Sequence, residues 1–400
     1  MATGLAACII LLPLAAGFSV PSLPVFRSAA HGGRGGAALR LVCQDQTKVS
    51  KGFNVLELTG ALIPQGKLVT GVKTGWKFAW TTLMRELAPQ SEDGSYVRPK
   101  YTFQQTISSD PGAKFPDEAG RYHLYAGKAC PWCHRVELAR AIRGLESYLS
   151  ITTVLDRPEE ASRGGWVFER SDPDPLFGAR DLREVYDGAV RGGFRGRCTA
   201  PLMVCKKTKS LVCNESADLV RMLNRVQAPP GSIDLYPEAL RKEIDSTNEW
   251  VYEDINNGVY RCGFATTQVA YDKAEESVFK AMDRLEEMLS KARFLCGDKF
   301  TEADLRLFPT IYRFDSVYHI LFRCSRRRVS DYPSIQGWLS DVYSLEGVKS
   351  TCDLKATVDS YYTQLFPLNP GGIVVRGPSP SELGLDVPSD RSVGDPFWYH

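Results

Sequence analysis

Two cysteines separated by two residues give this 400-residue sequence its strongest chemical signal, in the run Cys130-Pro131-Trp132-Cys133. Apolar patterning predicts a strand over 122–126 and a helix over 132–145, so Cys130 falls where a strand leads into a helix. Backbone N–H groups without partners and the helix dipole stabilise a thiolate at such a position and lower its pKa. Pro131 suits a first helical turn, because the N–H that it lacks would have no partner there. The pattern favours redox or group-transfer chemistry by Cys130.

A zinc site is the alternative interpretation of the cysteine pair. No second CxxC run and no paired histidines complete such a site, so we expect no metal. His134 and Arg135 follow the pair directly, and we expect both on a solvent-facing helix surface rather than in catalysis. Most of the other cysteines stand singly, and we expect them to be free thiols in a reducing compartment.

Two runs further along the chain could complete a binding site. Thr199-Ala200-Pro201-Leu202 precedes a strand, where a thioredoxin-like fold often has a cis proline that presents the backbone before it to a peptide-like ligand. An ordinary proline at the start of a strand is the alternative. Asn214-Glu215-Ser216 begins a helix, where a carboxylate, a hydroxyl and free N–H groups could hold the charged ends of an amino acid. Alone this second run is a capped helix, but with the cysteine loop and the proline it outlines a cradle for glutathione.

The elements that would position these runs alternate between strand and helix. Residues 150–155 predict a second strand, and 201–204 and 211–213 predict a hairpin, which is followed by a helix capped by Ser216. Strand, helix, strand, hairpin and helix is the thioredoxin-like order. A long polar insert separates the second strand from the hairpin.

Beyond a Pro- and Gly-rich linker the pattern becomes helical. Apolar stripes over 240–255 and 274–289 predict two helices, the first of which ends at Asn257-Gly258 as a left-handed stop. Thr301 and Asp304 predict a capping box, and Pro333 predicts the start of a last helix. We therefore predict an α/β thioredoxin-like domain followed by an all-α domain. The expected ranges are a targeting presequence 1–45, an irregular extension 46–120, a thioredoxin-like domain 121–226, a linker 227–237, a helical domain 238–365 and an extended tail 366–400.

Charge and the N-terminal residues bear on the partners and the location of the protein. Forty-nine basic and 47 acidic residues give a net charge of +2, so we expect no nucleic-acid partner. The apolar stretch 5–16 is too short to span a bilayer, and a basic, acid-free segment follows it, with no acid before Asp45. This arrangement resembles two-part plastid presequences, with the secretory pathway or the cytoplasm as alternatives. No other segment reaches spanning length, so we expect no membrane partner. Trp76, Phe78 and Trp80 in the extension are expected to cover apolar surface.

The chain also resembles a known family, the xi class of glutathione transferases, also called glutathionyl-hydroquinone reductases. The resemblance covers roughly residues 95 to 378, and its most specific run is Asn256–Ala265. The other runs that carry it are Gly120–Tyr125, Ala129–Trp132, Gly165–Phe168, Asn214–Ser216, Thr301–Phe308, Arg313–Tyr318 and Asn369–Val374.

The resemblance implies roles for residues at matching positions. Cys130 would be the nucleophile, Tyr260 and Tyr318 would line a quinol pocket, and Tyr361 is a weaker candidate for the same pocket. Glutathione, the co-substrate, would be held by Trp166, Arg197, the backbone of Ala200 beside Pro201, and Glu215 with Ser216. Quinone-type small molecules would be the other substrates, and family members form homodimers.

The sequence departs from the family at three places. Cys133 stands where the family usually has alanine or serine, and could resolve a mixed disulfide internally. Thr199-Ala200-Pro201 stands where the family has Thr-Val-Pro. The stretch Ala356–Tyr362 lacks the histidines and the lysine of the family, which bears on the substrate.

The expected activity is glutathione-dependent reduction of glutathionyl-hydroquinones through a Cys130–glutathione mixed disulfide. An omega-like thiol transferase or dehydroascorbate reductase is the enzyme alternative. A non-catalytic ligand-binding or redox-sensing protein is the alternative from another class.

Overall fold

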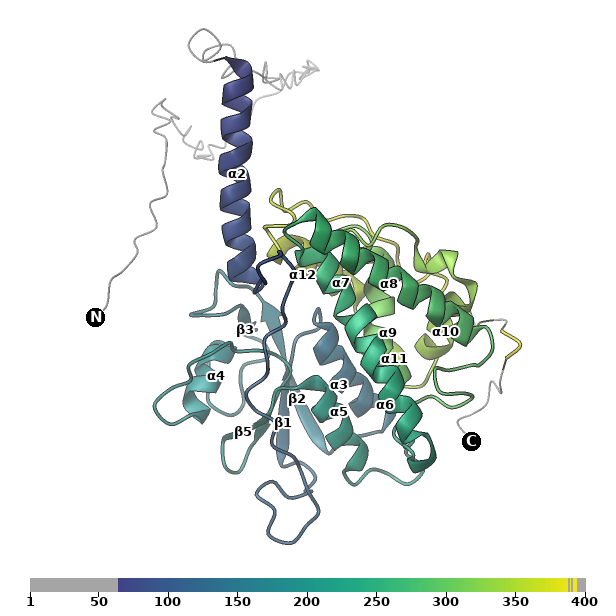
Figure 1. The fold of residues 1–400 in the computed structure, drawn as a ribbon. Coiled ribbons are helices and arrows are strands. Elements are labelled where there is room, and N and C mark those ends of the chain that lie inside the picture. The colour runs from purple at the N-terminus through teal and green to yellow at the C-terminus, as the bar shows by residue number, and fades with distance from the viewer. Residues whose placement is uncertain (1–63, 388, 390, 394–400) are drawn as a thin grey trace, which may run out of the picture. The chain divides into compact units, whose positions relative to one another are not determined.

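The computed structural model describes residues 64–387, 389 and 391–393 (Figure 1). The predicted presequence and the first part of the extension lie outside these residues. From Gly66 onward the chain belongs to one unit. In the described part, no helix is both long enough and apolar enough to cross a membrane.

A five-stranded mixed sheet forms the α/β part, in the order β3-β2-β1-β4-β5. Central β1 pairs in parallel with β2 and antiparallel with β4, and β5 completes the predicted hairpin. The short β3, which sequence patterning missed inside the polar insert, pairs antiparallel with β2. The strands are β1 Tyr122–Ala126, β2 Leu149–Asp156, β3 Trp166–Phe168, β4 Leu202–Cys205 and β5 Ser210–Cys213.

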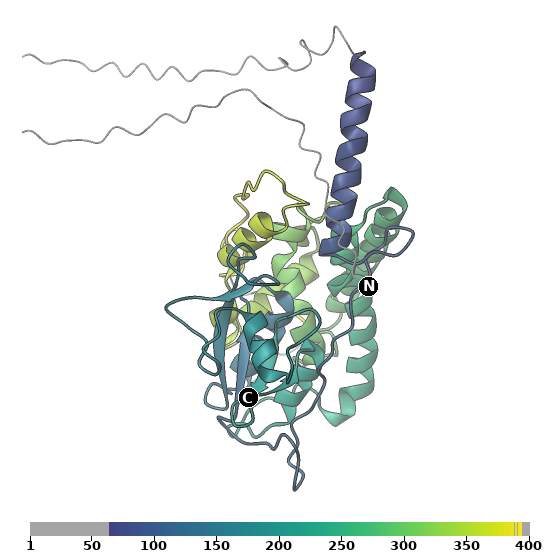
Figure 2. The same cartoon turned by 90° about the vertical axis from the view of Figure 1, so that its left-hand side faces the viewer.

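Three helices accompany the sheet. Helices α3 (Pro131–Ile142) and α5 (Ser216–Arg225) lie on the face toward the C-terminal helices, and α4 (Leu182–Ala189) lies on the other side (Figures 1 and 2). Helix α4 was not predicted, although Asp181 caps it by accepting a hydrogen bond from the Glu184 backbone N–H at 2.9 Å. Strand, helix, strand, hairpin and helix confirm the thioredoxin-like prediction.

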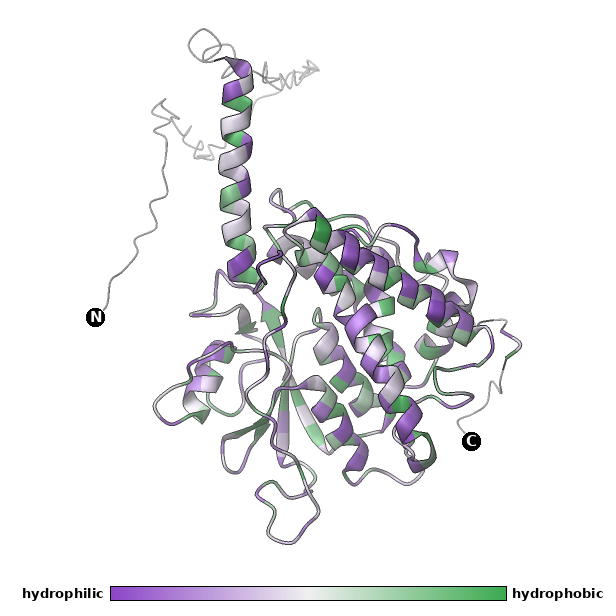
Figure 3. Ribbon diagram, in the orientation of Figure 1, coloured by the Kyte–Doolittle hydropathy of each residue, from purple (hydrophilic) through white to green (hydrophobic). Residues whose placement is uncertain are grey.

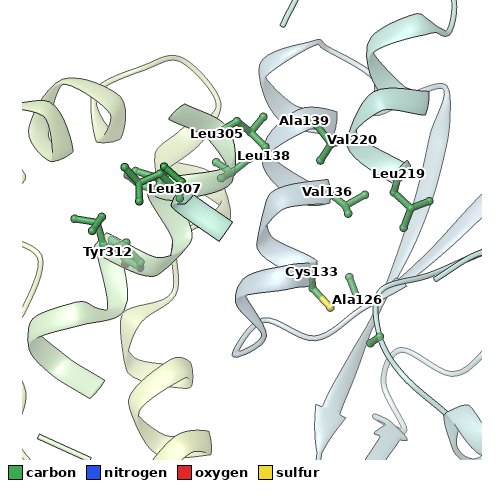
Figure 4. Close-up of a cluster of buried hydrophobic side chains, with 14 of the residues drawn as sticks. Ala126, Cys133, Val136, Leu138, Ala139, Leu219, Val220, Leu305, Leu307 and Tyr312 are labelled. Atoms are coloured by element: carbon green, nitrogen blue, oxygen red, sulfur yellow. The ribbon is translucent and has the colours of Figure 1, made fainter. Parts of the chain in front are cut away.

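Helix α3 is buried on both sides because it lies between the sheet layer and the helical part. Figure 4 shows Val136 and Ala139 facing Val220 of α5, while Leu138 faces Leu305 near the start of α9. All of these side chains are at most 1% exposed, so their apolar surface is removed from water. This burial fixes α3, and with it Cys130 at the start of α3, relative to both parts of the chain.

The chain from Glu238 to Gln364 is mainly helical, as predicted. Thr301 and Asp304 form the expected capping box at the start of α9. Helix α10 begins at Pro333 as expected, but it is not the last helix, because α11 and α12 follow. The elements are η1 Glu238–Leu240, α6 Arg241–Trp250, η2 Val251–Asn256, α7 Gly258–Phe264, α8 Gln268–Leu289, α9 Glu302–Arg313, η3 Phe314–Tyr318, η4 Val329–Asp331, α10 Pro333–Tyr343, α11 Val348–Thr351 and α12 Leu354–Gln364.

The predicted stop at Asn257-Gly258 is wrong. Asn257 keeps right-handed helical angles, and the chain runs from α6 through the π-helical turn η2 into α7. Gly258 is needed for a different reason: a Cβ there would lie 3.0 Å from Cγ2 of Val278 on α8. The glycine permits close helix packing rather than a left-handed turn.

The extension expected to be irregular contains a 23-residue helix, α2, at Gln65–Leu87. Only its C-terminal end is docked. Met84 is fully buried, and Trp80 donates its indole N–H to the Pro367 carbonyl oxygen at 2.8 Å. Trp80 therefore covers apolar surface as expected, but Trp76 and Phe78 are exposed, contrary to expectation.

Candidate active site

Cys130 lies at the N-cap of α3, with Pro131 in the first turn, as the sequence predicts. Its side chain is partly exposed. A hydrogen bond from the Cys133 thiol lowers the pKa of Cys130 against the opposing effect of burial. The backbone N–H groups of Cys133 and Trp132 and the charge of Arg313 lower this pKa further. The expected thiolate at the start of a helix therefore has several donors that stabilise it.

Cys133 is the buried member of the pair. Its side chain is fully buried and points toward Ala126 at the end of β1 (Figure 4). Burial and the hydrogen bond to Cys130 raise the pKa of Cys133 well above its usual value. Both cysteines are free thiols in this structure. The pair thus consists of an acidic, reachable thiol and a neutral thiol beneath it that donates to it.

The proline loop faces this pair. The Ala200–Pro201 peptide is cis, and Cys130 Sγ lies 3.9 Å from the Ala200 carbonyl oxygen. The cis geometry agrees with the first interpretation of Pro201, and the Ala200 backbone faces Cys130; its contact with a ligand stays a prediction.

Glu215, rather than Ser216, is the N-cap of α5. Its carboxylate accepts from the Ala217 backbone N–H at 2.9 Å and from the Ser216 hydroxyl at 3.3 Å. Ser216 is the first helical residue rather than the cap, so the helix begins one residue earlier than predicted. Ala217 and Asp218 line an open groove of about 480 Å³ together with Tyr252 of η2. Glu215 and Ser216 themselves are not among the residues that line this groove.

Trp166, at the start of β3, lies against the loop that leads to Cys130. A Cβ built on Gly127 would lie 2.4 Å from Cζ3 of Trp166, so the indole packs directly on the Gly127 backbone. Arg197 is placed differently: its guanidinium is exposed and donates to the Leu87 carbonyl oxygen at the end of α2, at 2.9 Å. No hydrogen bond or ion pair joins Arg197 to the other predicted glutathione-binding residues, and its role stays a prediction.

Three tyrosines meet in the helical part. Tyr361 bridges the other two through its hydroxyl, at 2.5 Å from the Tyr260 hydroxyl and 3.2 Å from the Tyr318 hydroxyl. Burial raises the pKa of all three phenols, so they are protonated at neutral pH. Tyr260 follows the π-helical turn η2 and Tyr318 ends the π-helical turn η3, and such turns are frequent at functional sites.

The tyrosine cluster lies beside the cysteine loop. The Trp132 ring centroid is 6.1 Å from that of Tyr260, and the charge of Cys130 contributes to the raised pKa of both Tyr260 and Tyr318. The structure thus brings the predicted nucleophile and the predicted quinol-pocket tyrosines together. Tyr361, the weaker candidate, is the centre of the cluster.

Sequence patterning missed two residues of the extension that reach this region. Arg98 stacks on the Trp132 ring at 4.2 Å and donates from Nε to Asn257 Oδ1 at 2.8 Å. Burial raises the pKa of the Tyr101 phenol, and the charges of Glu215 and Cys130 add to this effect. Tyr101 is therefore near enough to both the cap of α5 and the nucleophile to feel their charges. No periodicity marks either residue, because both belong to a segment without regular structure.

The expected solvent-facing positions of His134 and Arg135 are wrong, because α9 and α11 cover that side of α3. His134 accepts from Arg313 Nη1 at 2.9 Å through Nδ1, which leaves Nε2 to bond the Thr351 hydroxyl, also at 2.9 Å. Arg135 donates to Asn256 Oδ1 at 2.5 Å. Both side chains are 2% exposed and tie α3 to the helical part.

Metal-binding residues are not gathered in the described residues: no three His, Cys, Asp or Glu side chains come together where they could hold an ion.

The sheet order, the thiol at the start of α3 and the cis proline facing it define a thioredoxin-like domain joined to a helical domain. The family model for the glutathione S-transferase N-terminal domain matches residues 129–226, and that for the C-terminal domain matches residues 268–340. The glutathionyl-hydroquinone reductase PcpF of Sphingobium chlorophenolicum is 42% identical, over 81% of this chain and 100% of its own length.

Two solved structures agree with these matches. The Xi glutathione S-transferase of Phanerochaete chrysosporium has a TM-score of 0.69 at 38% identity, over 75% of this chain and 97% of that one. The glutathione-bound structure of YqjG, a glutathione transferase homolog from Escherichia coli K-12, has a TM-score of 0.68 at 37% identity, over 75% of this chain and 98% of that one. The chain belongs to the Xi class of the glutathione S-transferase family, and it is a glutathione-dependent enzyme.

Proposed function

We propose that this enzyme reduces glutathionyl-hydroquinones to hydroquinones, with glutathione as the second substrate. The observation that carries the proposal is the position of Cys130, which is partly exposed and acidic, between the cis-proline loop and the tyrosine cluster. The relative from Sphingobium chlorophenolicum bears the name of this activity.

Glutathione binding is assigned to the residues around the cysteine loop. The Ala200 backbone would pair with the cysteinyl part of glutathione, as cis-proline loops pair with extended ligands. Glu215 and Ser216 at the start of α5 would hold the charged γ-glutamyl end, and Trp166 would cover the ligand from the side of Gly127. Arg197 is the remaining residue that is predicted to contact glutathione.

The first half-reaction exchanges a carbon–sulfur bond for a sulfur–sulfur bond. The Cys130 thiolate attacks the sulfur of the glutathionyl-hydroquinone, and the electron pair of the carbon–sulfur bond passes to the ring carbon. That carbon takes up a proton, and the hydroquinone leaves. A mixed disulfide between Cys130 and glutathione remains.

The second half-reaction regenerates the enzyme. A glutathione thiolate attacks the mixed disulfide, oxidised glutathione leaves, and Cys130 returns as a thiolate. Its low pKa favours this step, because a more acidic thiol is a better leaving group. Cys133 offers a second route, in which its sulfur attacks Cys130 and releases glutathione, but this thiol must first lose a proton in a buried site.

The tyrosine hydroxyls are the proton donors nearest to the nucleophile. Because burial keeps Tyr260, Tyr318 and Tyr361 protonated, they can donate hydrogen bonds to the quinol oxygens and a proton toward the departing carbon. In this chain Ala356 and Ser360 stand in the stretch where the family has histidines. Ser360 donates to Asp156 Oδ2 at 3.0 Å, and the loss of the family's histidines at these two positions bears on which quinone the enzyme takes.

The test is turnover of glutathionyl-menadiol by the purified protein, with release of menadiol followed by chromatography. Cys130→Ala should abolish turnover, and Cys130→Ser should behave in the same way. A wild-type protein that reduces mixed disulfides of small thiols but not glutathionyl-menadiol would instead be an omega-like thiol transferase. Turnover that persists in Cys130→Ala would refute the mechanism.

Two further expectations belong to the proposal. The basic, acid-free N-terminal segment supports delivery to a plastid, which a fusion of residues 1–63 to a fluorescent protein tests. Membership in the family supports a homodimer, which sedimentation equilibrium tests.

A further inference from the structure

Helix α2 carries a hydrophobic face that nothing in the described chain covers. Trp76 is 58% exposed and Val72 is 64% exposed, and Val69 and Leu83 are also exposed. Figure 3 shows hydrophobic residues recurring along this helix. Apolar side chains this large are normally buried, so an exposed helical stripe of them indicates a contact surface.

The apolar residues follow helical spacing and therefore share one side of α2. Leu68, Val72, Trp76, Ala79 and Leu83 recur at intervals of three and four residues. The opposite side is polar, with Thr70, Thr74 and Thr81. Phe78 is an exception, because it projects from the polar side and is 76% exposed.

The charge of α2 has one sign over almost its whole length. It carries Lys67, Lys73, Lys77 and Arg85, and its first acidic residue is Glu86, next to its last residue. None of these four cations has an ion-pair partner among the described residues. A basic polar side and an apolar side with a tryptophan are the features of helices that lie in a membrane interface.

The helix is fixed at one end only. Met84 is fully buried, and Trp80 is bonded to Pro367, whereas every residue from 69 to 79 is exposed. The apolar side can therefore meet a flat surface while the C-terminal end stays attached to the enzyme.

Charge distinguishes an anionic membrane from the other possible occupants. A second copy of α2 would bring four more cations against the four already there. Residues 1–63 contain five basic residues and only two acidic ones, Asp45 and Glu57, so this segment carries a net positive charge and offers no complementary charge either. An anionic lipid surface offers both the apolar phase and the opposite charge.

We propose that α2 is an interfacial anchor that places the Val72–Trp76 face among the headgroups of an anionic membrane. The sequence has no further segment long enough to span a bilayer, but an interfacial helix needs no such length, so the expected absence of a membrane partner does not extend to α2. The proposal is independent of the reaction that the enzyme catalyses.

The experiment is flotation of the full chain with phosphatidylcholine vesicles that do or do not contain phosphatidylglycerol. Wild-type protein should float only with the phosphatidylglycerol vesicles and should be released by high salt. The double variant Val72→Ser/Trp76→Ser should bind about tenfold more weakly. Phe78→Ser is the matched control, because it removes an equally exposed aromatic from the polar side, and it should bind like wild type. Lys73→Glu/Lys77→Glu should also weaken binding.

The possible outcomes separate the occupants. Wild-type protein that fails to float with anionic vesicles overturns the proposal, and so does equal binding by wild type and Val72→Ser/Trp76→Ser. A self-associated wild type that becomes monomeric in the double variant, without vesicle binding, identifies a second copy as the occupant and likewise overturns the proposal. Circular dichroism and turnover with glutathionyl-menadiol should be unchanged in all these variants, since their side chains are exposed and distant from Cys130 in the chain.

Discussion

Arg313 of the helical part donates from Nε to the carbonyl oxygen of Ala129, at 3.2 Å, directly before Cys130. Its Nη2 donates to the Lys128 carbonyl oxygen at 3.1 Å. One guanidinium therefore holds two successive carbonyl groups of the cysteine loop and places a positive charge near the nucleophile. The contact links the end of α9 to the loop that positions Cys130.

Replacing Arg313 should make Cys130 a weaker nucleophile at neutral pH. Arg313→Ala removes a charge that lowers the pKa of Cys130, so that pKa should rise, and each unit of rise means about tenfold less thiolate below the pKa. The measurement is the rate of alkylation by iodoacetamide as a function of pH. Arg313→Lys keeps the charge without the paired hydrogen bonds. The pKa of Cys130 should therefore lie between those of Arg313→Ala and wild type, but turnover should not recover. An unchanged alkylation profile in Arg313→Ala would contradict this role.

Cys133 can be tested by two substitutions that differ in one property. Cys133→Ser keeps a donor to Cys130, whereas Cys133→Ala removes it, and that hydrogen bond is the main reason that the pKa of Cys130 is low. We expect a raised Cys130 pKa in Cys133→Ala and a smaller change in Cys133→Ser, read from thiolate absorbance during a pH titration. Both variants lack the sulfur of the internal route, so both should accumulate the mixed disulfide when glutathione is withheld.

If the two variants titrate alike, Cys133 does not act as a donor. If wild type also accumulates the mixed disulfide, visible by mass spectrometry as one added glutathionyl group, the internal route is closed and glutathione alone completes the cycle.

Local signals in the sequence were sufficient for much of the site. Cys130 at a helix start, the proline before β4 and the capping box at Thr301 each depend on residues close together in the chain, and all three are found. The thioredoxin-like order follows from the same kind of signal. The sequence therefore predicts a helix or strand of the site when the residues that begin that helix or strand lie within it or next to it in the chain.

Features that depend on distant packing were not predictable. His134 has the polarity of a surface residue but is buried, because Arg313, 179 positions later, supplies its partner. Gly258 has the sequence context of a stop, but it makes room for α8. In α2, Gly66, Gly71 and Gly75 lower the helix propensity and hide the amphipathic pattern.

Tyr361 is expected to be the most sensitive of the three tyrosines. Its hydroxyl joins those of Tyr260 and Tyr318, so Tyr361→Phe breaks both hydrogen bonds while the ring remains. Turnover of glutathionyl-menadiol should fall by about a hundredfold or more, in the range expected for loss of a positioned proton donor. Alkylation of Cys130 should change little, and that rate is the control. Tyr362→Phe removes a neighbouring hydroxyl outside the cluster and should change the turnover of glutathionyl-menadiol very little.

Asp156 should make stability depend on pH. Burial raises the pKa of this carboxyl to about 6 from 3.8, while the Ser360 hydroxyl opposes the rise. The folded protein therefore binds this proton more tightly than the unfolded chain does. The resulting stability is fully present below about pH 4 and is lost as pH rises through about 6. Asp156→Asn should be up to about 3 kcal/mol more stable than wild type at pH 8 and no more stable at pH 4.

Urea unfolding at both pH values measures this difference. Ser360→Ala removes the hydrogen bond that lowers the pKa of Asp156, so in that variant the loss of stability should extend to higher pH. A gain in Asp156→Asn that is the same at both pH values would mean that the charge of Asp156 is not its cause.

Gly127→Ala should test the packing of Trp166 over the cysteine loop. The new methyl group would lie 2.4 Å from Cζ3 and 2.8 Å from Cη2 of Trp166, closer than carbon atoms can approach, so the indole must move. We expect the KM for glutathione to rise by about tenfold with a smaller change in kcat, because the displaced ring contributes binding rather than chemistry. Trp166→Ala removes the ring and should raise KM similarly. In the double variant Gly127→Ala/Trp166→Ala the two effects should not add, because the methyl group then has no indole to displace. Additive losses would show that Gly127 acts on the Cys130 loop directly and that Trp166 is not the ligand contact.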